Sequence, residues 1–297
     1  MKILLFGRDG QVGWELQRSL ALLGELVALG RAGDGALCGD LADTEGIART
    51  VLQVRPDVVV NAAAYTAVDK AESEAALAET VNAAAPGALA EAAARVGAAL
   101  VHFSTDYVFD GSGARPWRED DPTGPLGAYG RTKLEGEHRI AAALPRHLIL
   151  RTSWVYGARG GNFAKTMLRL ARERAELKVV DDQVGAPTGA ELLADVTAHA
   201  LRPLLAGQAA PGVYHVAAAG ETSWHGYARF VVARAQQAGQ VLQAGPQQVL
   251  PIATSAYPTP ARRPHNSRLD SARLRATFGL ELPPWEQGVA RMLEEIL

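Results

Sequence analysis

Short apolar runs alternate along this chain with segments whose apolar residues recur three or four positions apart. Uninterrupted runs are typical of strands covered by helices on both faces, and the wider spacing marks one face of a helix. The alternation predicts a parallel sheet between two helical layers. Strands are expected at 2–6, 25–29, 58–60, 99–103 and 147–152, with helices at 12–23, 47–54, 72–96 and 162–174.

The C-terminal third mixes short strands, such as 213–216, with helices at 223–237 and 284–297. We therefore expect an α/β fold, a Rossmann-type doubly wound parallel sheet followed by a smaller, mixed α/β C-terminal lobe that binds substrate. Residues 1–155 are assigned to the dinucleotide-binding domain and 156–297 mainly to the substrate lobe. Later segments such as 177–181 are expected to return to the first domain.

A glycine-rich turn joins the first strand to the first helix. Glycines let the backbone turn tightly and approach a pyrophosphate, whose charge is then stabilised by free N–H groups at the helix N-terminus. The spacing here, Gly-x-x-Gly-x-x-Gly, differs from Gly-x-Gly-x-x-Gly, so an ordinary tight turn remains the alternative. The predicted cofactor contacts in this turn are Gly7, Gly10, Gln11, Val12 and Gly13.

A second cluster of polar residues begins where the strand at 99–103 ends. Ser104, Thr105 and Asp106 lie at its carboxyl end, where open α/β sheets bind ligands. Tyr129 and Lys133 are four residues apart in a segment of helix formers, so their side chains share one helical face. A nearby ammonium favours the phenolate form and suits the pair for proton transfer. The alternative is a partly buried aromatic beside a solvated lysine.

Composition narrows the function classes. The chain has 48% hydrophobic residues, 21% charged residues and a formal net charge of -2, so no general attraction to nucleic acid or anionic membrane is expected. The only cysteine, Cys38, excludes an intramolecular disulfide and paired metal thiolates. The first apolar run is too short for a signal peptide, and no segment has the length of a membrane span. A cytoplasmic location is expected.

The glycine turn and the Tyr-x-x-x-Lys pair resemble the extended short-chain dehydrogenase/reductase family. Segments 104–111, 129–137 and 185–188 resemble its nucleotide-sugar reductases in particular. This resemblance implies hydride transfer from NADPH or NADH to the C4 keto group of a dTDP-6-deoxy-4-ketohexose. It also implies that Tyr129 supplies the proton, that Lys133 lowers the tyrosine's pKa and holds the nicotinamide ribose, and that Thr105 bonds the reacting oxygen.

The same resemblance implies further contacts. Gly30 stands where relatives often carry an acid and Arg31 follows it, which favours NADPH over NADH. Each of these contacts has an alternative. The arginines could lie in solvated loops, and Asp40 could cap a helix. The alanines could serve only for packing, and Trp154 could be a core residue. The implied cofactor contacts are Arg31, Asp40, Leu41, Ala62, Ala63 and Ala64, and the implied substrate contacts are Thr105, Asp106, Trp154, Asn162, Arg262 and Arg263.

Glu15 and Glu191 resemble acids that hold magnesium at a subunit contact in some family members, although scattered carboxylates usually lie on solvated helix faces. A homodimer is left open. Two other functions also remain. One is a 4-epimerase or 4,6-dehydratase on the same fold, although a dehydratase typically has an acid where Tyr107 stands. The other is a non-catalytic subunit similar to the regulatory subunit of methionine adenosyltransferase.

Overall fold

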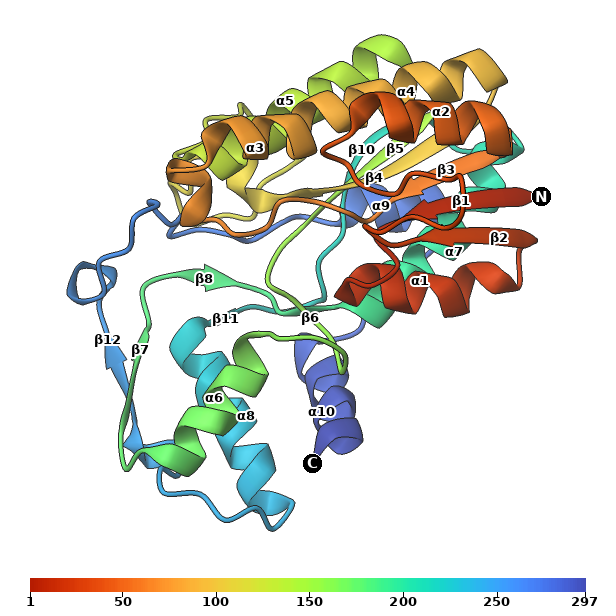
Figure 1. The fold of residues 1–297 in the computed structure, drawn as a ribbon. Helices are drawn as coiled ribbons and strands as arrows, with labels where there is room; N and C mark the ends of the chain where they lie inside the picture. Colours follow the sequence, from red (N-terminus) through yellow and green to blue (C-terminus); the bar gives the residue numbers. More distant parts are fainter.

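A six-stranded parallel sheet forms the centre of the larger lobe (Figure 1). The computed structural model describes residues 1–297. The strand order is β10-β5-β4-β3-β1-β2, so the chain starts in the interior of the sheet and winds outward in both directions. The expected doubly wound Rossmann-type sheet is confirmed. Its strands are β1 (Lys2–Phe6), β2 (Glu25–Leu29), β3 (Val58–Asn61), β4 (Ala99–Thr105), β5 (His147–Thr152) and β10 (Gly212–His215).

Helices cover both faces of the sheet, as the continuous apolar runs predicted. Successive strand residues point to opposite faces, so Ile3 and Leu5 belong to one hydrophobic core, while Leu4 and Phe6 belong to a second core on the other face. Figure 1 shows these two layers on either side of the sheet. One layer contains α1 (Gln11–Ala21), α7 (Ala190–Leu205) and α9 (Ala272–Phe278), and the other contains α2 (Thr44–Val54), α4 (Ala85–Val96) and α5 (Ala128–Ala143).

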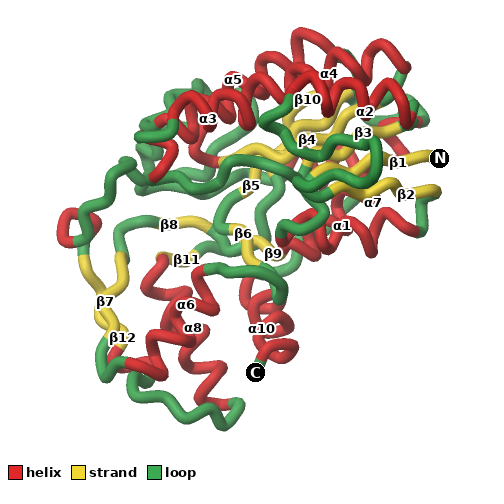
Figure 2. The backbone as a smooth tube through the Cα atoms, in the orientation of Figure 1, coloured by secondary structure: helices red, strands yellow, loops and turns green.

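The smaller lobe has a core of its own, in which three helices pack together. Its central side chains include Tyr227, Trp285 and Val289, all buried. Figure 2 shows this lobe as helices flanked by short strands and long loops. Its elements are α6 (Phe163–Glu173), β7 (Leu177–Val180), β8 (Val184–Gly185), β11 (Thr222–Ser223), α8 (Trp224–Gln237), β12 (Val249–Ile252) and α10 (Trp285–Ile296).

The segment that returns to the large sheet was predicted wrongly. Residues 177–181 contain β7, which pairs in parallel with β12 in a separate two-stranded sheet. The returning strand is β10, which pairs with β5 and had been expected in the smaller lobe. The physical reason is burial: Tyr214 of β10 belongs to the large core, whereas Leu177 and Val179 pack with the small one.

Short elements connect these parts. A π-helical turn, Thr80–Ala84, joins α3 (Ala75–Glu79) to α4 without a break, and Pro86 lies in the first turn of α4. The remaining strands, β6 (Val155–Tyr156) and β9 (Thr188–Gly189), pair in parallel. None of the helices is long and apolar enough to cross a membrane.

Candidate active site

The glycine turn places the N-terminus of α1 against the carboxyl end of β1. Gly7 has φ +88°, and a Cβ there would lie 2.6 Å from the Ala63 nitrogen. A Cβ on Gly13 would lie 1.9 Å from the Gly7 carbonyl oxygen. Both glycines are therefore required by the tight turn itself. Near Gly10 the protein leaves more room, and the first N–H groups of α1 have no intrahelical partner there, so the turn fits a diphosphate.

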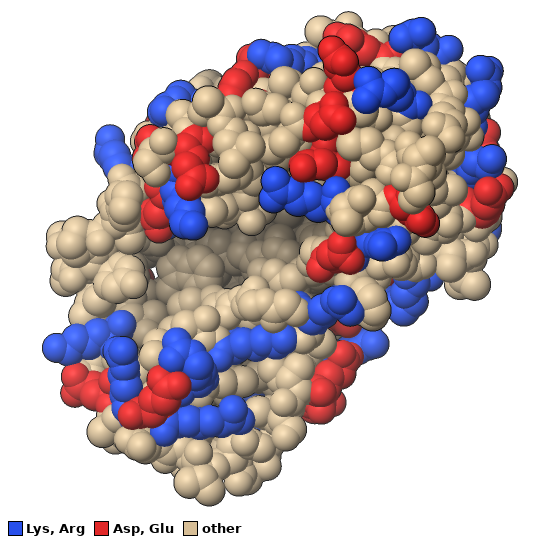
Figure 3. Space-filling view, viewed as in Figure 1, with Lys and Arg blue, Asp and Glu red and all other residues tan.

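A cleft of about 630 Å³ runs from this turn across the carboxyl ends of β1, β3 and β4. Figure 3 shows the hollow between the two lobes, with uncharged walls and charged side chains along its rim. The cleft lies beside the point where the strand order reverses, as expected for a doubly wound sheet. The predicted site residues that line it are Gly7, Gly10, Gln11, Val12, Arg31, Asp40, Leu41, Ala62, Ala63, Ala64, Thr105, Asp106, Tyr129, Lys133 and Trp154.

Two elements bring the proton-transfer candidates together. Thr105 ends β4, and its hydroxyl donates to Asp106 Oδ1 at 3.1 Å. Tyr129 lies in the first turn of α5, a helix whose start is held by a hydrogen bond from the Ala128 N–H to Glu72 Oε1 at 2.7 Å. Lys133 follows one turn later and is only 1% exposed. The cleft therefore contains a phenol, a hydroxyl and an amine.

Burial dominates the electrostatics of these groups. Burial raises the pKa of Tyr129, and a hydrogen bond with Thr105 offsets part of this rise. Burial also lowers the pKa of Lys133 to about 8. Burial also raises the pKa of Asp106 to about 6, and the Oδ2 atom of this carboxyl has no partner. Burial therefore outweighs the neighbouring groups at Tyr129, and the tuning of this phenol by Lys133 stays a prediction. The same low-dielectric surroundings disfavour both the phenolate and the ammonium.

A buried ion pair lies beneath the site and was not expected from the sequence. Glu137, one turn beyond Lys133, contacts Arg151 at 2.6 Å, with side-chain exposures of 3% and 5%. Ser104 donates a hydrogen bond to the same carboxylate. Helical spacing places Glu137 on the face of Lys133, but no sequence signal pointed to its partner in β5. This pair joins α5 to β5, and the hydrogen bond from Ser104 joins the same carboxylate to β4.

The far end of the cleft has the features expected for the ribose of a nucleotide. The Arg31 side chain is 79% exposed and contacts Asp40 at 3.2 Å. A Cβ at Gly30 would lie 2.0 Å from Asp9 Oδ2, so the acid often found in relatives has no room unless Asp9 moves. Asp9, which the sequence analysis did not select, lines the cleft. Asp40 accepts from the Ala42 N–H, while the cap of α2 is Asp43.

Trp154 lines the cleft near its entrance to the smaller lobe. It has φ +51°, which is uncommon for a bulky residue and is found chiefly at functional sites. Its ring stacks on Trp224 with centroids 3.6 Å apart. The ring of Trp154 is partly buried: it forms part of the cleft wall and also packs against the core of the smaller lobe, so both predictions for Trp154 hold in part.

Three predicted substrate residues do not line the cleft. Asn162 caps α6, as its position suggested, and its amide donates to Gln11 Oε1 at 3.1 Å. Arg263 contacts Asp69 at 2.6 Å, and Arg262 is exposed. The polar groups of Asn162 and Arg263 are thus already paired within the protein.

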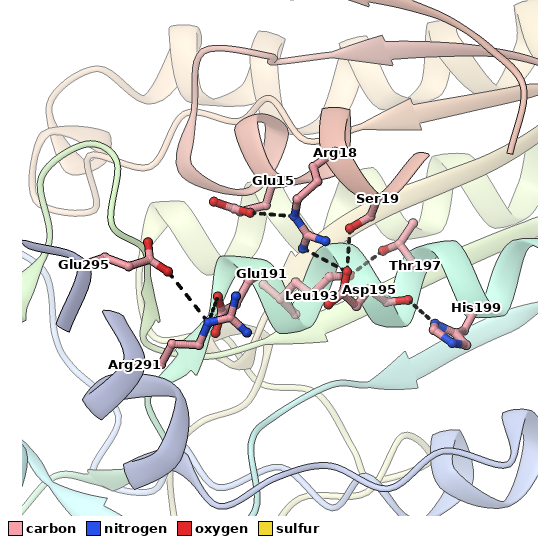
Figure 4. Close-up of polar contacts among 10 residues, drawn as sticks. All are labelled: Glu15, Arg18, Ser19, Glu191, Leu193, Asp195, Thr197, His199, Arg291 and Glu295. Atoms are coloured by element: carbon pink, nitrogen blue, oxygen red, sulfur yellow. Dashed lines mark hydrogen bonds and ion pairs between the residues drawn. The ribbon is translucent and has the colours of Figure 1, made fainter. Parts of the chain in front are cut away.

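The proposed magnesium ligands lie on a separate surface formed by α1, α7 and α10 (Figure 4). Glu15 contacts Arg18 at 3.5 Å, and Glu191 contacts Arg291 at 3.6 Å. No group of three or more histidine, cysteine or acidic side chains in the chain could hold a metal ion. The expectation of a magnesium site is therefore not supported, because the carboxylates are paired with guanidinium groups.

The doubly wound sheet, the glycine turn and the Tyr129–Lys133 helix beside one cleft define a short-chain dehydrogenase/reductase of the extended type. The sequence matches the RmlD substrate binding domain family over residues 1–297, and the chain belongs to that family.

Similar proteins agree with this assignment. The chain is 56% identical over 296 residues to a dTDP-4-dehydrorhamnose reductase of Shigella flexneri, covering 100% of this chain and 98% of the relative. A crystal structure of a dTDP-4-dehydrorhamnose reductase from Clostridium acetobutylicum is 37% identical, with TM-score 0.89 and 99% coverage of both chains. That of Bacillus anthracis, in complex with NADP, is 33% identical, with TM-score 0.86 and 99% coverage of both.

Proposed function

We propose that this protein reduces the C4 keto group of dTDP-4-dehydro-6-deoxy-L-mannose to give dTDP-L-rhamnose, using NADPH or NADH. The observation that carries the proposal is that Thr105, Tyr129 and Lys133 line the same cleft as the glycine turn. The substrate is inferred from the relatives, which are dTDP-4-dehydrorhamnose reductases over their full length.

The site residues fit a nicotinamide cofactor. The backbone leaves no room for a side chain at Gly7 or Gly13, and no side chain caps the start of α1. A turn of this kind can bind a diphosphate through its free N–H groups. Ala62, Ala63 and Ala64 present small side chains to the same cleft. When bound, the dihydronicotinamide supplies the hydride that forms the new C–H bond at C4.

The residues of the chain supply the proton. As the carbonyl carbon is reduced, negative charge grows on its oxygen and is neutralised by the Tyr129 hydroxyl, which donates its proton, and by a hydrogen bond from Thr105. The raised pKa of Tyr129 keeps the phenol protonated before the reaction. The phenolate left behind then needs a nearby cation, a role that Lys133 fulfils in its ammonium form.

NADPH is the favoured cofactor. Arg31 lines the cleft, and its guanidinium group is paired only with Asp40, which lines the same cleft. Guanidinium groups bind phosphate oxygens well, and Gly30 removes the acid that would repel a 2′-phosphate. Asp106, Trp154 and the region of the smaller lobe beyond them are proposed to contact the sugar and its nucleotide.

The dehydratase alternative lacks its second acid. Tyr107 follows Asp106, packs edge-to-face against Tyr129 with centroids 5.5 Å apart, and has its pKa raised to about 12 by burial. A group that stays protonated in this way is a poor base for water elimination.

The proposal is tested by following NADPH absorbance with dTDP-4-dehydro-6-deoxy-L-mannose as substrate. One cofactor oxidised for each sugar reduced is the expected stoichiometry. Turnover of a nucleotide sugar without net cofactor loss would indicate an epimerase or dehydratase instead. Binding of NADPH without any turnover would favour the non-catalytic role.

A further inference from the structure

Lys133 of α5 contacts a buried histidine of β4. Its Nζ lies 2.6 Å from the Phe103 carbonyl oxygen and 2.9 Å from His102 Nε2. His102 is 1% exposed and faces Asn61 across the pairing of β3 with β4. The Nδ2 atom of Asn61, also 1% exposed, lies 3.1 Å from His102 Nδ1. Asn61, His102 and Lys133 therefore form a continuous chain of hydrogen bonds.

The orientation of the Asn61 amide follows from its other contact. Its Oδ1 accepts the Ala63 N–H at 3.1 Å. A backbone N–H can only donate, so the oxygen must face it and the NH₂ group must face His102. Turning the amide over would set two donors against each other at Ala63 inside the protein, where an unpaired polar group is costly.

The amide in turn determines the histidine tautomer. Because Asn61 donates to Nδ1, that nitrogen carries the lone pair and the proton of the neutral ring is on Nε2. The Nε2–H then points at Lys133 Nζ. If Lys133 were an ammonium, one of its N–H groups would face the Nε2–H of His102, and two donors would meet. A neutral amine instead accepts a hydrogen bond from Nε2–H through its lone pair and donates one to the Phe103 carbonyl oxygen.

We propose that Asn61 and His102 are positioning residues that set the protonation state of Lys133: Asn61 holds the imidazole as the Nε2–H tautomer, and this N–H favours the neutral amine of Lys133 over its ammonium. The link to catalysis rests on the proposed function, in which the ammonium form of Lys133 supports Tyr129, so the two residues set the upper pH limit of activity.

Titratable groups face Lys133 from its own helix, from the cleft and from β4. Glu137 on the same helix raises the pKa of Lys133, but its carboxylate is paired with Arg151. Tyr129 and Asp106 lie on the cleft side, and burial keeps Tyr129 protonated. Burial and Lys133 hold the pKa of His102 well below its usual range, so the imidazole stays neutral. The balance at Lys133 thus depends on which nitrogen of His102 carries the proton.

Changing Asn61→Asp tests this dependence with almost no change in shape. One carboxylate oxygen still accepts the Ala63 N–H, and the other, in place of the NH₂ group, accepts from His102 Nδ1. The proton of the ring then moves to Nδ1, and Nε2 presents a lone pair that stabilises the ammonium of Lys133. A matched control is Asn82→Asp, since Asn82 is also fully buried but contacts Tyr65 and Thr132 instead of His102.

The direct readout is the ring ¹⁵N spectrum of the protein labelled at its seven histidines, recorded without cofactor. Three other histidines serve as internal references: Nδ1 of His147 and of His215 face carbonyl oxygens, as does Nε2 of His225. Loss of one signal set in His102→Gln assigns His102. We expect the Nε2–H tautomer in the wild type and in Asn82→Asp, and the Nδ1–H tautomer in Asn61→Asp.

An Nδ1–H tautomer at His102 in the wild type would overturn the inference, and so would an unchanged tautomer in Asn61→Asp. These spectra do not require turnover, so they separate failure of this inference from failure of the proposed function. In the active enzyme, the alkaline limb of the kcat/KM profile should move up by about one pH unit in Asn61→Asp. A purely structural role would lower kcat/KM at every pH and leave that limb in place.

Discussion

The buried pair of Glu137 and Arg151 makes a quantitative prediction for stability. Arg151 contacts both carboxylate oxygens, with Nε to Oε1 at 3.0 Å and Nη2 to Oε2 at 2.6 Å. In Arg151→Met the apolar chain fills much of the same space, but Glu137 keeps only the hydrogen bond from Ser104. Breaking a buried pair by removing one partner costs about 3 to 5 kcal/mol. We expect a loss of that size in the free energy of unfolding.

The assay is urea unfolding followed by circular dichroism, with Arg139→Met as a matched control. Arg139 lies on the same helix as Glu137 and contacts Glu135 at 2.7 Å. The side chains of Arg139 and Glu135 are 42% and 44% exposed, so the loss of Arg139 should cost at most about 1 kcal/mol. The double variant Arg151→Met with Glu137→Leu should regain most of the stability, because no unpaired charge remains. Equal losses in Arg151→Met and Arg139→Met would show that burial adds nothing to the cost of leaving Glu137 unpaired.

Three further predictions follow from the cleft and the glycine turn. Arg31→Ala should weaken NADPH binding by about tenfold and leave NADH binding nearly unchanged, as measured by cofactor fluorescence, since a charge-assisted phosphate contact contributes about 1.5 to 3 kcal/mol; equal losses for both cofactors would argue against the 2′-phosphate contact. Gly13→Ala should abolish cofactor binding or folding, because its Cβ would lie 1.9 Å from the Gly7 oxygen, and calorimetry showing normal binding would contradict the close approach. Asp106 has its pKa raised from 3.8 to about 6, so the folded state favours the protonated form and the group's contribution is lost as the pH rises through about 6. Relative to the wild type, Asp106→Asn should therefore gain up to about 3 kcal/mol of stability between pH 4 and 7, and a constant difference over that range would contradict it.

Local patterns predicted the parts of the structure that depend on neighbouring residues. The apolar runs gave the five strands of the large sheet that lie before residue 153, and the Tyr129–Lys133 spacing put both side chains on one helix beside the cleft. The glycine spacing identified a turn whose geometry tolerates no side chain at Gly7 or Gly13.

Features that depend on distant pairing were missed. Nothing in the sequence showed that β10 would pair with β5 in the large sheet, because an apolar strand can be buried equally well in the core of the large lobe or of the small lobe. His102 and Asn61 lie within or at the end of apolar strands, so their polar contacts became visible only when β3 and β4 were aligned. Arg263 was expected to bind a phosphate, but it contacts Asp69, nearly two hundred residues away in the chain.

We infer that the Tyr129 hydroxyl supplies the proton for carbonyl reduction. The most direct measurement compares kcat and NADPH affinity for the wild type and Tyr129→Phe with the dTDP-4-keto sugar. We expect kcat to fall by about 10² to 10⁴-fold while the dissociation constant for NADPH changes little, because only the proton donor is removed. Turnover by Tyr129→Phe at the wild-type rate would show that Tyr129 is not the proton donor.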